Sequence, residues 1–186
     1  MELKKLTKIH EGKFLSYYEA DFLNNDNKIK KYEFISRDKN LNEKTFGNDK
    51  PAGVGMLCYN LDKTKVLVQK EFRLACNKWI YNFPAGLIDE GETPVEAARR
   101  ELKEETGVNL VKVDAVLPTS YASQGTSDEQ MVIVVCRCEG EIVNSKDANE
   151  EIEAMWLTKE DVKKLFDNKE YMSVRTQISL WQWINE

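Results

Sequence analysis

The sequence predicts a domain of the α+β class, and three observations support that prediction. Several short segments alternate apolar and polar residues, one strongly capped helix lies near the middle, and two amphipathic helices end the chain. Strands, one helix, further strands and terminal helices do not give the regular alternation of a parallel α/β sheet. With 186 residues, the chain is long enough to bury a substantial apolar core.

Residues 1–46 are expected to form an N-terminal β region. Residues 14–22 and 29–35 alternate partly between apolar and polar side chains, with an asparagine-rich turn between them, and this pattern predicts a β-hairpin. The stretch 40–51 is polar and contains glycine and proline, which is typical of a linker. We therefore expect the N-terminal β region to be followed by a main domain at 47–186.

The clearest single element is a helix over residues 93–106. Thr93 is placed to cap its N-terminus, and Glu96 completes the capping box three residues later. Gly107 supplies a left-handed residue that ends the helix.

Further strands and two terminal helices complete the expected main domain. The strands are expected at 54–59, 66–69, 110–117, 131–137 and 152–157. One terminal helix is capped at Thr158, and the other begins near Ser173. The apolar residues expected at their helical spacing are Val162, Leu165 and Phe166 in the first helix, and Val174, Ile178, Trp181 and Ile184 in the second.

Composition excludes several classes of function. Lys and Arg number 27 against 32 Asp and Glu, a net charge of −5, so a general nucleic-acid binder is not expected. The longest apolar run, 131–136, is far too short to span a bilayer, so we expect no membrane segment and a cytoplasmic protein. The four cysteines follow no zinc spacing, and His10 is the single histidine, which excludes a multi-histidine metal site. If the protein is an enzyme, carboxylates must carry its chemistry.

Most of the net negative charge lies in one segment. Residues 86–108 read GLIDEGETPVEAARRELKEETGV and hold seven acidic and three basic side chains. On a helix, Glu101, Glu104 and Glu105 share one edge, beside the apolar face. Such an edge is either a solvated charged face or a site for a hard divalent cation such as Mg²⁺, which takes oxygen ligands and is commonly shared with substrate phosphates.

This segment resembles the Nudix box, G-x5-E-x7-R-E-U-x-E-E-x-G-U with U apolar, and it matches the pattern at every position. The matching residues are Gly86, Glu92, Arg100, Glu101, Leu102, Glu104, Glu105, Gly107 and Val108. The resemblance implies an α/β/α sandwich hydrolase that cleaves nucleoside diphosphates linked to another group. It also implies Glu101 and Glu105 as the main ligands of Mg²⁺, or of Mn²⁺ in its place. Further ligands would be Glu104 and the Ala85 carbonyl.

The order of elements resembles the ADP-ribose pyrophosphatase branch of that family. This implies a small-molecule nucleotide substrate and a homodimer formed through the N-terminal strands. Arg73, with Arg37 from the partner subunit, would bind substrate phosphates, Trp79 or Tyr121 would stack on the base, and Asp128 would lie at the substrate. The branch takes its general base from a loop glutamate; Glu150 is expected here, with Glu151, Glu153 and Glu129 as alternatives.

Two residues depart from the pattern of the branch. The usual Ser-Pro-Gly motif is replaced by Ser-Gln-Gly with Gln124 at its centre, and Asn82 stands where the family tends to have Glu. The expected reaction is hydrolysis of ADP-ribose to AMP and ribose 5-phosphate. The alternatives are another nucleotide sugar, a nucleoside triphosphate, or a non-catalytic domain that binds a nucleotide for regulation.

Overall fold

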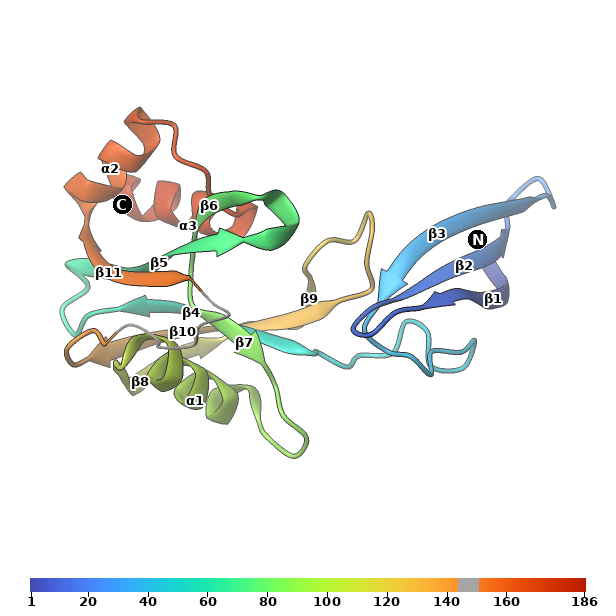
Figure 1. The fold of residues 1–186 in the computed structure, drawn as a ribbon, viewed down its shortest axis with the longest axis horizontal. Helices are drawn as coiled ribbons and strands as arrows, with labels where there is room; N and C mark the ends of the chain where they lie inside the picture. The colour runs from blue at the N-terminus through green and yellow to red at the C-terminus, as the bar shows by residue number, and fades with distance from the viewer. Residues whose placement is uncertain (144–150) are drawn as a thin grey trace. The chain divides into compact units, whose positions relative to one another are not determined.

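The computed structural model describes residues 1–143 and 151–186 as two compact units (Figure 1). The first unit contains Met1–Ala52 and Thr119–Met131, and the second contains Gly53–Pro118 and Val132–Glu186. None of the helices in these described parts has the length and apolar character needed to cross a membrane.

The elements follow the order expected for the α+β class, with strands, one central helix, further strands and two terminal helices. In chain order they are β1 (Glu2–Glu11), β2 (Ser16–Leu23), β3 (Ile29–Ser36), β4 (Gly53–Tyr59), β5 (Lys65–Arg73), η1 (Leu74–Cys76), β6 (Lys78–Asn82), β7 (Ala85–Leu87), α1 (Pro94–Thr106), β8 (Asn109–Val116), β9 (Ser120–Tyr121), β10 (Gln130–Glu139), β11 (Ile152–Thr158), α2 (Lys159–Asp167) and α3 (Val174–Asn185).

The first unit contains an antiparallel sheet in the order β1-β2-β3. Tyr18, Ala20 and Phe34 form its small core, and the Phe34 ring stacks on Phe46 with centroids 4.9 Å apart. The expected hairpin is confirmed as β2 and β3, whereas β1 was not predicted. Two register irregularities interrupt the pairing of β1 with β2. Its apolar residues therefore recur at every third position, and this spacing hides the alternation of apolar and polar residues that marks a strand.

Backbone pairing places the segment 119–131 in the first unit although it is distant from that sheet in sequence. Ile35 forms a bridge to Ser127, and its N–H donates to the carbonyl of Thr126 over 3.0 Å. The Ala52 N–H likewise donates to the carbonyl of Gln130. These contacts close the loop between β9 and β10 against the end of β3.

The second unit is a sheet with helices on both faces, as Figure 1 shows. Its main strand order is β11-β5-β4-β10-β8, with β6 and β7 pairing with β5 and β4. One apolar core lies between the sheet and α1, and a second lies beneath α2 and α3. This is the α/β/α sandwich expected from the sequence.

The predicted central helix is confirmed as α1. The Thr93 side chain accepts from the Glu96 N–H, the Glu96 carboxylate accepts in return from the Thr93 N–H, and Gly107 has φ +72°. Ala98 and Leu102 are fully buried against the sheet. This packing fixes the rotation of the helix and therefore the direction of its acidic edge.

The helix α3 is confirmed, but of its four predicted apolar residues only Ile184 packs against the core. Its buried residues are Thr176, Leu180 and Trp183, whereas Val174, Ile178 and Trp181 are exposed by 60% or more. Both faces carry apolar residues at helical spacing, so periodicity alone does not distinguish them. Thr176 is buried because its hydroxyl accepts a hydrogen bond from the Phe83 N–H, a contact that hydrophobicity does not signal.

Candidate active site

The centre of the candidate site is the contact between Gly86 and Glu101. Gly86 lies in β7, and a Cβ at this position would be 2.0 Å from Cδ of Glu101 and 2.3 Å from both carboxylate oxygens. A side chain here would therefore occupy the space of the carboxylate. Glycine at the start of the box allows the sheet backbone to approach the first predicted metal ligand closely.

Arg100 organises the acidic edge of α1. Its Nε and Nη2 donate to the two carboxylate oxygens of Glu92 over 2.9 and 2.8 Å, and Nη1 donates to Glu101 over 2.8 Å. Nη1 also reaches Glu104 at 3.3 Å. The hydrogen bonds from Arg100 lower the pKa of Glu92 to about 2. One guanidinium thus compensates the repulsion among neighbouring carboxylates.

Glu105 is held from the sheet by Gln69, a residue that the sequence reasoning did not single out. Gln69 is 2% exposed at the middle of β5, and its Nε2 donates to Oε2 of Glu105 over 2.8 Å. A buried amide requires hydrogen-bond partners, so a glutamine within the apolar run VLVQ was the available signal. Gln69 fixes the orientation of the second predicted main ligand.

The residues of the acidic edge fit a hard divalent cation in their chemistry. Glu101 and Glu105 offer carboxylate oxygens, the Ala85 carbonyl belongs to β7 next to Gly86, and Glu104 is the most exposed of the three glutamates. Their oxygens are not gathered, however. Across the described residues, the acidic side chains form no group of three whose ligand atoms all lie within 4.8 Å of one another. Nη1 of Arg100 lies between Glu101 and Glu104 and donates to both, and mutual repulsion opposes a closer approach of the carboxylates.

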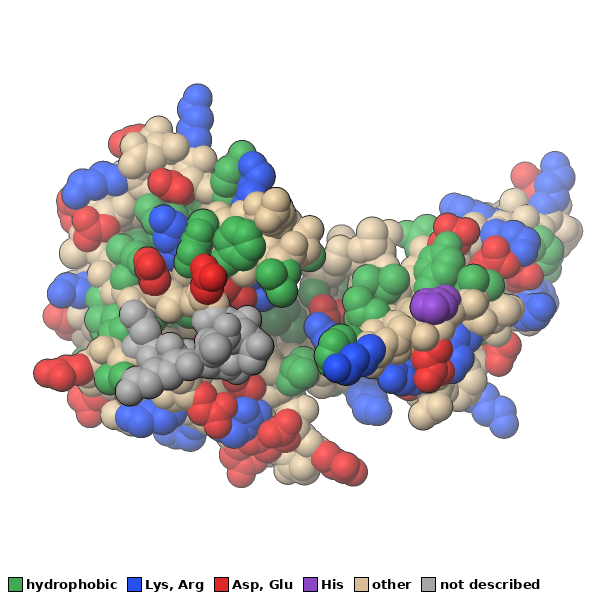
Figure 2. All heavy atoms as spheres, viewed as in Figure 1, with side chains coloured by type: hydrophobic (Ala, Val, Ile, Leu, Met, Phe, Trp, Pro, Cys, Tyr) green, Lys and Arg blue, Asp and Glu red, His purple; other side chains and the backbone are tan. Residues whose placement is uncertain are grey.

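Acidic side chains gather over α1 and the loop before it, as the space-filling view shows (Figure 2).

The segment from β6 to β7 is held by α3, because the Phe83 N–H donates a hydrogen bond to the Thr176 hydroxyl. The Tyr81 N–H also donates to the carbonyl of Tyr171 over 2.8 Å, and Tyr81 accepts from the Ser173 N–H. The start of α3 thereby positions the strand that leads into Ala85 and Gly86.

Arg73 and Trp79 lie at paired ends of β5 and β6. The Arg73 side chain is 55% exposed and pairs with Glu71. Asn82, buried in β6, donates from Nδ2 to the other oxygen of Glu71 over 3.2 Å. The Trp79 ring is packed edge-on against Phe72 and stays 37% exposed. Asn82 and Arg73 therefore share Glu71 as a partner. This contact gives a structural role to Asn82, the residue that stands where the family tends to have Glu.

Arg37 and Asp128 lie in the first unit, where the loop 123–129 meets the end of β3. Arg37 Nε donates to Glu129 over 2.7 Å, and the Ser36 hydroxyl donates to Asp128 over 2.8 Å. Burial raises the pKa of Asp128, while the bond from Ser36 opposes that shift. The structure thus brings these two predicted substrate residues into one cluster with Glu129.

The expected base, Glu150, lies outside the described residues. Of the alternatives, Glu151 directly precedes β11 and Glu153 lies within it, and both are exposed. The Glu151 carbonyl accepts from the Phe72 N–H over 3.1 Å. Glu129 is paired with Arg37. Tyr121, the alternative to Trp79 for stacking, accepts at its hydroxyl from Gln130.

Comparison with known proteins agrees with this geometry. The family model for the NUDIX domain matches residues 49–176. A Bacillus subtilis (strain 168) protein described as ADP-ribose pyrophosphatase is 30% identical over 185 residues, covering 97% of this chain and 91% of that protein. A Mus musculus ADP-sugar pyrophosphatase is 32% identical over 99 residues, covering 53% of this chain and 44% of that protein.

A solved structure gives the same fold. The crystal structure of an ADP compounds hydrolase superposes with a TM-score of 0.72 and 18% sequence identity, covering all of this chain and 93% of that one. The family match spans more than half of the chain, and it includes the capped helix, the Gly86 contact and the acidic edge. The chain therefore belongs to the Nudix hydrolase family.

Proposed function

We propose that this protein hydrolyses the pyrophosphate bond of ADP-ribose, giving AMP and ribose 5-phosphate. The observation that carries the proposal is the position of Glu101 and Glu105, one packed on Gly86 and the other held by Gln69, at the edge of a complete Nudix box. The names of the two pyrophosphatase relatives support a diphosphate sugar as the substrate class. A silent regulatory domain would not need to keep every carboxylate of this edge.

The proposed metal ligands are the side chains of Glu101, Glu104 and Glu105 and the Ala85 carbonyl. Mg²⁺ is the proposed ion, with Mn²⁺ as a substitute of similar ligand preference. Such an ion supplies charge neutralisation at the pyrophosphate and a lower pKa for the attacking water. Within the chain, Arg100 and Gln69 hold two of the carboxylates in place.

The proposed substrate contacts are Arg73, Trp79 and Asp128, with Arg37 contributed by the partner subunit. Arg73 is exposed and carries a planar fork that fits phosphate oxygens, and the exposed part of the Trp79 ring offers a stacking surface. Asp128 and Arg37 offer an acceptor and a donor for sugar hydroxyls and phosphate. Glu150 remains the proposed base that removes the proton from the attacking water.

The alternative substrate is another nucleotide sugar, and the observation that favours it is the loop around Gln124. The Thr126 N–H donates to the Ser123 carbonyl over 2.9 Å, so Gln124 occupies the second position of a four-residue turn. Proline is favoured there, and glutamine leaves the turn less constrained while adding an amide. That amide changes which hydroxyl pattern the loop accepts.

A substrate panel tests the proposal. Purified protein with Mg²⁺ is given ADP-ribose, other nucleoside diphosphate sugars, ATP and dGTP, and the products are identified by mass spectrometry. We expect AMP and ribose 5-phosphate, with kcat/KM for ADP-ribose at least about 10-fold above that for either triphosphate. Faster release of pyrophosphate from a triphosphate would overturn the substrate assignment. Absence of metal-dependent turnover of every compound would overturn the assignment of a catalytic activity.

We also propose a cytoplasmic homodimer whose interface includes the N-terminal region 1–46. Several large apolar side chains of this region are exposed, among them Ile9, Phe14 and Ile29, and a second copy would cover them. The buried cysteines are compatible with a reducing compartment. Light scattering coupled to size exclusion should give twice the chain mass of 21.5 kDa, and a monomer at micromolar concentration would contradict the dimer.

A further inference from the structure

Three of the four cysteines meet beneath α1, away from the acidic edge. Cys136 and Cys138 lie two residues apart on β10 and so point to the same face of the sheet. Cys58 lies on the neighbouring strand β4. The separation between Sγ of Cys58 and Cys136 is 3.3 Å, that between Cys136 and Cys138 is 3.6 Å, and all three sulfurs lie within 4.8 Å of one another.

These distances suit three sulfur ligands around one ion. An ion about 2.3 Å from each of three sulfurs at the corners of a triangle requires sulfur separations of about 4.0 Å. The separations of 3.3 and 3.6 Å are shorter than that figure, so the sulfurs would have to move apart by a few tenths of an ångström to surround an ion. No carboxylate or imidazole belongs to this group, which sets it apart from the oxygen ligands of the acidic edge.

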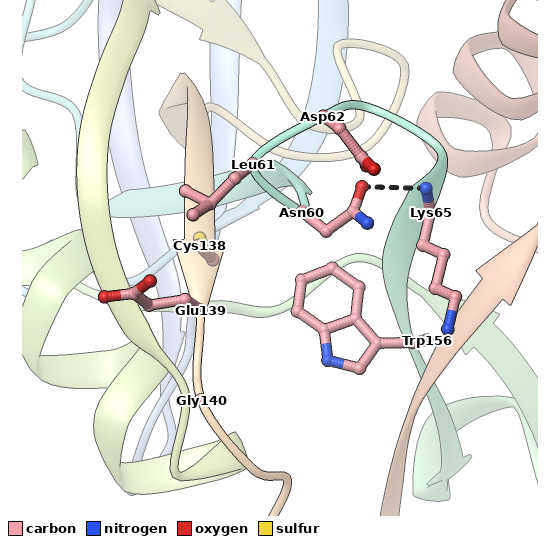
Figure 3. Close-up of a pocket in the computed structure, with 8 residues that line it drawn as sticks. All are labelled: Asn60, Leu61, Asp62, Lys65, Cys138, Glu139, Gly140 and Trp156. Atoms are coloured by element: carbon pink, nitrogen blue, oxygen red, sulfur yellow. Dashed lines mark hydrogen bonds between the residues drawn. The ribbon is translucent and has the colours of Figure 1, made fainter.

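A cavity borders the cysteine cluster at Cys138. It has a volume of about 360 Å³ and is lined by Cys138, Leu61 and Trp156, with Asp62, Lys65 and Glu139 among the polar residues around it (Figure 3). Cys138 is itself 1% exposed, and Cys58 and Cys136 are fully buried and do not line the cavity. An ion that enters the cavity meets Cys138 before the other two thiols.

We propose that Cys58, Cys136 and Cys138 form a three-thiolate site for a soft monovalent metal ion of the Cu(I) type, reached through the cavity beside Trp156. Sulfur-only ligands select soft ions, and three of them without a fourth protein ligand do not complete the tetrahedral set of a structural zinc site. This site is separate in residues and in ligand chemistry from the one proposed for hydrolysis.

Cysteine variants test the proposal, with Cys76 as the matched control. Cys76 is exposed in η1 and lies outside the cluster, so Cys76→Ala removes the one thiol that could bind copper adventitiously at the surface. In this background, the reduced protein is titrated with Cu(I) held by a chromophoric chelator, and the bound copper is counted. We expect one Cu(I) per chain, with affinity more than about 100-fold weaker after Cys58→Ala, Cys136→Ala or Cys138→Ala.

Two further measurements keep the test decisive. X-ray absorption on the copper-loaded Cys76→Ala protein should show three sulfur neighbours, which does not depend on the folding of the other variants. Zn(II) in equal amount should not displace the copper. Failure of the Cys76→Ala protein to bind, fewer than three sulfur neighbours, or displacement by Zn(II) would each overturn the proposal, and none of these results bears on hydrolysis of ADP-ribose.

Discussion

Two arginines of the second unit, Arg100 and Arg73, pair with glutamates in different surroundings. The Arg100 side chain is 27% exposed and donates to Glu92, Glu101, Glu104 and the Leu87 carbonyl. Arg73 is 55% exposed and pairs with Glu71 at the end of a strand. A guanidinium with many partners holds carboxylates in place, whereas an exposed ion pair contributes little to stability and exchanges its partner for a substrate anion at low cost.

The largest effect is expected at the carboxylates that the first arginine and Gln69 hold. Glu101→Gln or Glu105→Gln keeps the size of the side chain and removes a charged ligand, so kcat should fall at least about 10²-fold, or about 2.7 kcal/mol. Steady-state kinetics on ADP-ribose measures this. Glu96→Gln on the same helix is the control, because glutamine also serves in a capping box. Rates near wild type for both variants would remove the metal-site assignment.

A second effect is expected on the pH dependence of stability when Arg100 becomes lysine. Arg100 holds the pKa of Glu92 at about 2, below its usual range, so this pair stabilises the fold above about pH 4.5 and loses its effect as the pH falls towards 2. Arg100→Lys lacks the two-pronged contact with Glu92 and should lower the melting temperature at pH 7 by on the order of 2–4 °C. Melting curves from pH 7 to 2 should show this difference shrinking; a constant difference would contradict the role given to Glu92.

A smaller and different effect is expected at the exposed arginine. Arg73→Ala should raise KM for ADP-ribose about 10-fold, equivalent to about 1.4 kcal/mol, while kcat and the melting temperature stay close to wild type. Lys163→Ala, which removes an exposed positive charge from α2, controls for the change in net charge. A fall in kcat at constant KM would show that Arg73 is not simply a binding group.

The smallest effect is expected in the loop of the first unit. Gln124→Pro fits the second position of the turn from Ser123 to Thr126 and should stabilise the protein by about 0.4–1 kcal/mol through the unfolded chain. If loop shape sets the choice of substrate, the ratio of kcat/KM for ADP-ribose to other nucleotide sugars should rise. An unchanged ratio in a correctly folded variant would assign that choice to other residues, such as Asp128.

Sequence reasoning succeeded where local signals determine the structure. The cap at Thr93, the stop at Gly107 and the spacing of the glutamates are all local, and α1 follows them. It failed where contacts between residues distant in sequence determine the structure. The irregular register of β1, the buried face of α3 and the contact from Gln69 to Glu105 each depend on a partner on another element. The box predicted which carboxylates form the edge, but not that a single nitrogen of Arg100 would donate to two of them.

The hydrogen bond from Asn82 to Glu71 has a consequence for how this site can change during evolution. A single replacement of Asn82 by glutamate would set a second carboxylate against Glu71 at a buried position, with no cation added. That intermediate would also disturb the partner of Arg73. A lineage that changes from asparagine to glutamate at position 82 is therefore expected to replace Glu71 first. The order of the two mutations, rather than either one alone, determines whether the intermediate protein is stable.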